Sequence, residues 1–128
     1  MGHQDNAYED GAAELHRWYA FTQKADRGMA LSKREEYGSA DLRIMAGAMA
    51  EFLPEPSPEA LGVAYPHLST ADALEAHYTE AAISFYTLGK VARVVGALSE
   101  GRVPSIDSWR DITVYSMMAR RVRQEGSW

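Results

Sequence analysis

Proline is concentrated in one stretch of this 128-residue sequence: four of its five prolines lie within residues 54–69, PEPSPEALGVAYPHLS. Proline lacks a backbone donor and clashes with the preceding turn, so no long helix can pass through this stretch. On both sides of it, apolar residues recur at intervals of three and four, and alternating β-branched runs are absent. The sequence therefore predicts helices before and after one ordered crossover, with at most one short turn at residues 58–61.

The helical pattern appears four times. Ser32 and Glu35 form an S-x-x-E capping box, Ser69 or Thr70 can cap a later helix, and Gly126 can end the last one. The predicted helices cover residues 8–30, 32–53, 70–99 and 107–124. We expect an all-α, four-helix-bundle-like single domain over residues 1–128, with the proline-rich crossover between its second and third helices and residues 1–7 as a flexible tail.

The third helix has a heptad-like apolar stripe, which we predict to face the core. Its members are Leu74, Tyr78, Ala81, Phe85, Leu88, Ala92 and Val95.

Composition excludes several kinds of function. The chain has no cysteine, so it has no disulfide and no thiolate metal site, and its net charge of −5 argues against a general nucleic-acid binder. The opening residues are acidic and polar, unlike a signal peptide, and no apolar run approaches the roughly 18 residues of a membrane span. We expect a cytoplasmic protein without a membrane partner.

An acidic pair breaks the apolar pattern of the last helix. In SIDSWRDITVYSMM, residues 105–118, Asp107, Asp111 and Tyr115 are spaced by four, and the same face continues into apolar residues. A capping box from Ser108 to Asp111, or Asp107 as the N-cap, would explain these acids locally. An inward, unpaired carboxylate would cost several kcal/mol, so Asp111 must otherwise meet a cation, a metal ion or hydrogen-bond donors.

Suitable cations occur in two other stretches. LGKVARVV, residues 88–95, places Lys90 and Arg93 three apart on one helix face, where they could also simply extend from the core edge to solvent. KREEYGSADL, residues 33–42, supplies Lys33. Two interpretations follow: a buried ion-pair network, or a polar pocket with carboxylates at one end and cations at the other. Such a pocket could take Mg²⁺ and a triphosphate.

Taken in chain order, the motifs in these two stretches and in the last helix resemble those of a known family. K-x-x-x-Y-G at Lys33, Tyr37 and Gly38 is followed by G-K-x-x-R from Gly89 and then by D-S-W-x-D-I-x-x-Y from Asp107. This order resembles small MazG-like proteins of bacteriophages, which belong to the all-α nucleoside triphosphate pyrophosphohydrolases. The resemblance covers about residues 31–124.

The resemblance implies a helical enzyme, dimeric or tetrameric, located in the host cytoplasm. Its reaction would be Mg²⁺-dependent, with Mn²⁺ as a substitute, and would cleave a (deoxy)nucleoside triphosphate or related nucleotide to a monophosphate and pyrophosphate. The residues it points to fall into three groups. The catalytic acids would be Asp111 and Asp107; the substrate-binding residues Lys33, Tyr37, Lys90, Arg93 and Tyr115; and the metal ligands Glu36, Asp41, Glu80 and Asp111.

One departure from the family pattern supports an alternative function. MazG enzymes usually carry E-x-x-E on one helix, and this chain has no E-x-x-E. A chain can keep a fold and lose its chemistry. The alternative is therefore a catalytically inactive helical module that binds a nucleotide or a host protein.

Overall fold

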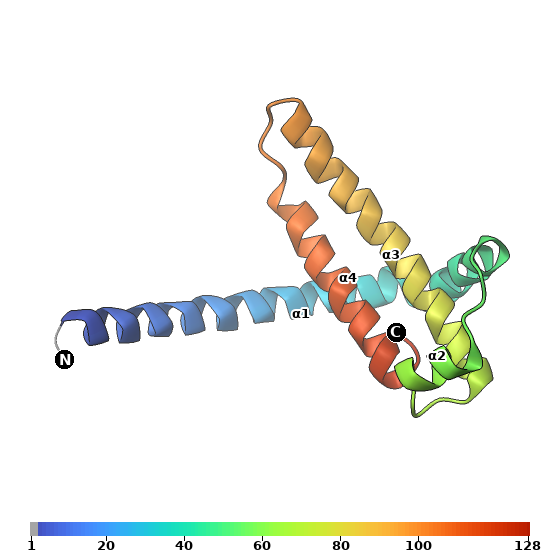
Figure 1. The fold of residues 1–128 in the computed structure, drawn as a ribbon. Helices are drawn as coiled ribbons and strands as arrows, with labels where there is room; N and C mark the ends of the chain where they lie inside the picture. The colour runs from blue at the N-terminus through green and yellow to red at the C-terminus, as the bar shows by residue number, and fades with distance from the viewer. Residues whose placement is uncertain (1–2) are drawn as a thin grey trace.

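Helices make up the whole regular structure of the described residues (Figure 1). The computed structural model describes residues 3–128, with the side chains of residues 9–35 and 41–128. In chain order the helices are α1 (His3–Phe52), α2 (Pro58–Ala64), α3 (Thr70–Ser99) and α4 (Ile106–Glu125). The predicted all-α class is confirmed for this part of the chain.

The first two predicted helices are one continuous helix, α1. Gly28 lies in its interior, and so does Ser32, which is therefore not at a helix start. A glycine costs a helix interior about 1 kcal/mol. The packing of Met29 and Ala30 against the core offsets that cost on the side where α1 meets the body. The start of α1 at His3 also brings residues 3–7, expected as a tail, into the helix.

α3 and α4 begin and end close to their predicted bounds, whereas the short turn expected at residues 58–61 is the start of a seven-residue helix, α2. Ser57 caps α2, and its hydroxyl accepts a hydrogen bond from the backbone N–H of Ala60. Ser69 caps α3 in the same way through Asp72. The N-cap of α4 is Ser105, not Asp107 or Ser108, and α4 ends at Gly126, whose φ of 88° is the left-handed conformation that glycine adopts most easily.

The helices form a hairpin crossed by a long rod (Figure 1). α3 and α4 run antiparallel and are joined at their far end by a short turn that contains Gly101, where φ is 72°. α1 packs across both of them with its second half, and α2 packs against α3. The first part of α1 projects away from this body as a single helix. We call residues 9–27 the α1 arm.

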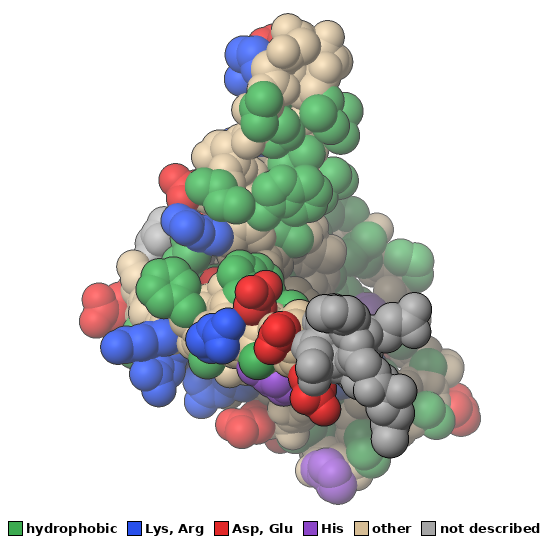
Figure 2. All heavy atoms as spheres, turned by 90° about the vertical axis from the view of Figure 1, so that its left-hand side faces the viewer, with side chains coloured by type: hydrophobic (Ala, Val, Ile, Leu, Met, Phe, Trp, Pro, Cys, Tyr) green, Lys and Arg blue, Asp and Glu red, His purple; other side chains and the backbone are tan. Residues whose placement is uncertain are grey.

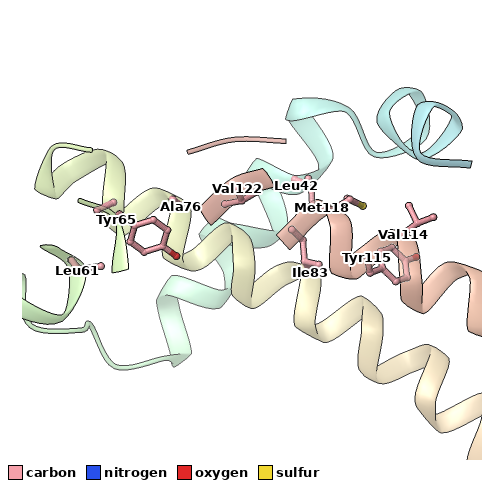
Figure 3. Close-up of a cluster of buried hydrophobic side chains, with 10 residues drawn as sticks. Leu42, Leu61, Tyr65, Ala76, Ile83, Val114, Tyr115, Met118 and Val122 are labelled. Carbon is pink, nitrogen blue, oxygen red and sulfur yellow. The ribbon is translucent and has the colours of Figure 1, made fainter. Parts of the chain in front are cut away.

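The core lies where α1, α2, α3 and α4 meet (Figure 3). α4 contributes one face at helical spacing, from Val114 and Tyr115 through Met118 to Val122, and none of these side chains is more than 1% exposed. Ile83 and Ala76 face them from α3. The apolar stripe predicted for α4 is therefore the centre of the core.

The stripe predicted for α3 faces the core only near the start of that helix. Tyr78 is buried, but Phe85, Leu88 and Val95 are more than half exposed, because Ile83, Val94 and Ala97 take the side toward α4. Figure 2 shows hydrophobic side chains gathered over the upper part of the molecule, where the α3–α4 hairpin lies. α3 is also the one described helix long and apolar enough to span a bilayer, a property shared by core helices of soluble proteins.

Candidate functional site

The carboxylate of Asp111 lies on the buried face of α4, and the whole residue is 8% exposed. Since α4 begins at Ile106, Asp111 is beyond its first turn, and a local capping role is excluded. Its position follows from spacing: Tyr115 and Met118, four and seven residues later, continue the same face into the core. Asp111 is therefore a carboxylate on a face of α4 that is otherwise apolar and buried.

Two lysines from two other helices neutralise this acid. Lys90 Nζ of α3 is 2.7 Å from Asp111 Oδ2, and Lys33 Nζ of α1 is 3.6 Å from Asp111 Oδ1. The three side chains are only 11–18% exposed. We call Lys33, Lys90 and Asp111 the lysine–aspartate cluster. It joins α1, α3 and α4 at one point, and each member comes from a different one of the three sequence motifs.

Aromatic rings cover the cluster on one side. Lys33 Nζ lies 5.4 Å from the ring centre of Tyr115, within the range of a cation–π interaction. Tyr86 of α3 stacks on Tyr115, with ring centres 6.0 Å apart and an interplanar angle of 20°. The ammonium group of Lys33 is therefore held against an aromatic face, where its field is screened less than in open water.

A small cavity opens beside the cluster along α3. It has a volume of about 220 Å³ and is lined by Phe85, Tyr86, Gly89, Lys90, Arg93 and Tyr115. Arg93 is exposed and forms no ion pair with the side chains that the structure describes. Among the described residues, the charged lining of the cavity consists of the two cations Lys90 and Arg93. The cavity is thus suited to an anion.

Two predicted acids lie outside the cluster. Asp107, one turn before Asp111, has a side chain that is 71% exposed and pairs with Arg110 at 3.4 Å. Glu80 binds Arg123 through two hydrogen bonds of 3.0 and 3.1 Å and accepts another from the hydroxyl of Tyr65. Its carboxylate ties α2, α3 and α4 together, so its role in this structure is a structural ion pair.

The carboxylates with described side chains do not fit a resident metal ion. Magnesium needs several oxygen ligands at once. Both oxygens of Asp111 face ammonium groups, Asp41 is exposed, and no group of three His, Asp or Glu side chains comes together within residues 9–35 and 41–128. The predicted ligand Glu36 and the predicted substrate contact Tyr37 lie outside the described side chains.

Sequence reasoning missed Tyr86 and the Glu80–Arg123 pair. Tyr86 precedes Lys90 by four residues and Arg93 by seven, so its place on the same face of α3 could have been read from spacing. Arg123 and Glu80 are 43 residues apart, and no local pattern links them.

No protein-family model, curated protein or solved structure matches the chain. The case for a function therefore depends on the chemistry of the cluster and its cavity.

Proposed function

We propose that this protein binds a nucleotide through its phosphates, at the cavity beside the lysine–aspartate cluster. The observation that carries the proposal is the presence of two cations, Lys90 and Arg93, in the lining of one partly enclosed cavity, next to the ion pair between Lys90 and Asp111. Phosphate oxygens are the acceptors that lysine and arginine bind most strongly.

The size and rim of the cavity support a nucleotide over free phosphate. A volume of about 220 Å³ accommodates phosphate groups but is below the usual range for a whole drug-sized ligand. Phe85 lines the cavity and is 55% exposed, so its ring can stack on a base that extends outward. The phosphates would lie against Lys90 and Arg93, with the base at Phe85.

Calorimetric titration with a panel of nucleoside mono-, di- and triphosphates tests this proposal. Arg93→Met removes an exposed cation without breaking an ion pair of the described side chains, and we expect it to weaken binding at least fivefold. Gly89→Ala adds a methyl group at the cavity, where no neighbouring atom lies within 4 Å of the new Cβ, and should weaken binding without harming the fold. Arg102→Met, far from the cavity at the hairpin turn, is the matched control.

Two results would contradict the proposal. One is the absence of binding by every nucleotide in the panel at millimolar concentration. The other is equal binding by wild type, Arg93→Met and Gly89→Ala, which would place the nucleotide elsewhere.

Hydrolysis of the bound nucleotide to a monophosphate and pyrophosphate is the second candidate. The meeting of Lys33, Lys90 and Asp111, one from each motif shared with MazG-like proteins, favours it. The nucleotide itself would bring magnesium, because its phosphates supply oxygen ligands. Pyrophosphate release with Mg²⁺ or Mn²⁺ should be measured for wild type and Asp111→Asn. Nucleotide binding without release would leave the protein a binder, and full release by Asp111→Asn would exclude a catalytic role for that acid.

A further inference from the structure

The α1 arm has an apolar face that no described part of the same chain covers. Leu15, Trp18 and Tyr19 are 55–62% exposed and lie on one side of the helix. Leu15 and Lys33 are 18 residues apart, about five full turns, so this face is the direct continuation of the one that Met29, Ala30 and Lys33 pack against the body. The face by which α1 packs on the body therefore continues along a part of the helix that is exposed to solvent.

A second uncovered face lies on the far half of α3. Leu88, Val91, Val95 and Leu98 are 39–63% exposed and recur at helical spacing; we call them the α3 stripe. Nearer its start, α3 packs against the second half of α1, where Leu42 of α1 shares the core with Ala76 and Ile83 of α3. Helix α1 is therefore already a packing partner of α3 in this fold, and no described part of the same chain covers the α3 stripe.

We propose that the α1 arm of one copy packs on the α3 stripe of a second copy, reciprocally, in a closed dimer with twofold symmetry. Each copy carries one uncovered α1 face and one uncovered α3 face, so one reciprocal contact between two copies covers all four faces. Such a contact is isologous and stops at two copies.

The area and the shape of the exposed surface agree with this partner. The seven side chains of the two faces expose on the order of 800 Å² per copy, which is about what each side of a standard interface contributes. At the base of the arm, Trp18 and Tyr19 also line a groove of about 690 Å³ against Met117 of α4, and a helix from a second copy could enter it.

Light scattering coupled to size exclusion, over a range of concentrations, is the first test. We expect twice the 14.2 kDa of one chain. Trp18→Glu and Leu88→Glu should each raise the dissociation constant at least tenfold, since each places a charge in the interface. Both positions are exposed within one copy, so circular dichroism should show unchanged helix content. A monomer at every concentration, or mass growth beyond a closed assembly, would overturn the proposal. Recovery of the monomer on phosphatidylcholine vesicles would also overturn it, because the apolar faces would then bind a lipid surface.

Cross-linking tests which faces meet. The chain has no cysteine, so single introduced cysteines are unambiguous. Leu15→Cys protein mixed with Leu88→Cys protein should form a mixed cross-linked pair with a bifunctional maleimide. Ala13→Cys, on the opposite side of the arm, should not. A dominant Leu88→Cys pair with itself would show α3 against α3 and would overturn the arm-to-stripe arrangement.

Discussion

Removal of the Lys90 charge should lower the free energy of unfolding far more than the loss of an ion pair on the protein surface would. Lys90 and Asp111 are 2.7 Å apart, and their side chains are 18% and 11% exposed. Loss of one partner of a buried pair costs about 3–5 kcal/mol, because the remaining charge is left in a poorly solvated place. Lys33, 3.6 Å from the other oxygen of Asp111, still offsets part of this cost. We expect Lys90→Met to lower the free energy of unfolding by about 2–3 kcal/mol.

The chain contains its own control for this experiment. Arg102 Nη2 and Glu100 Oε2 form a pair at the same 2.7 Å, but their side chains are 62% and 64% exposed. Exposed pairs contribute little, so Arg102→Met should change the free energy of unfolding by less than about 0.5 kcal/mol. The two pairs share the same distance and differ in burial, so the comparison isolates the effect of burial.

Urea denaturation at one fixed protein concentration measures both variants, because any self-association would otherwise shift the midpoint. The double variant Lys90→Met with Asp111→Asn should lose less free energy of unfolding than the sum of the losses in the two single variants. The difference should be at least about 1 kcal/mol. If Lys90→Met cost no more than Arg102→Met, or if the two losses were additive, the cluster would not be a coupled buried ion pair.

Three further predictions concern the core and the helix ends. Met118→Ala should cost about 2–5 kcal/mol in urea denaturation, because Met118 is fully buried and its removal leaves a cavity. Arg123→Met should cost about 1–2 kcal/mol by the same measurement, because it leaves Glu80 with fewer donors; an equal loss from Gln124→Met, its exposed neighbour, would refute this reason. Gly126→Ala should lower the free energy of unfolding by about 1 kcal/mol or more, because its φ is 88° and the new Cβ would lie 3.2 Å from Leu68; an unchanged free energy of unfolding would contradict the left-handed cap.

Much of the helix pattern could be predicted because its signals are local. Ser69 caps α3, proline excludes a long helix from residues 54–69, and Gly126 ends α4, as the sequence indicated. Ser32 shows the limit of local signals. Its capping box with Glu35 is a valid helix start in isolation, but packing on both sides carries α1 straight through it.

The candidate site was predictable in part for a related reason. An acid on an apolar stripe needs a partner, and the sequence offered Lys90, Arg93 and Lys33; the structure brings Lys90 and Lys33 to Asp111 and leaves Arg93 in the adjoining cavity. Which face of α3 is buried could not be predicted. Larger residues such as Leu88 point outward and smaller ones such as Ala97 pack inward, so the heptad-like spacing predicted the wrong face for the second half of α3.

Because α1 is a single helix, it can transmit torsion between two distant points. Leu15 and Lys33 share one side of it, about five turns apart, with unbroken backbone hydrogen bonding between them. A molecule that rolled the arm about its long axis would turn the ammonium of Lys33 away from Asp111 by the same angle. If the proposed dimer fixed the rotation of the arm about its axis, it would also fix where Lys33 lies relative to Asp111.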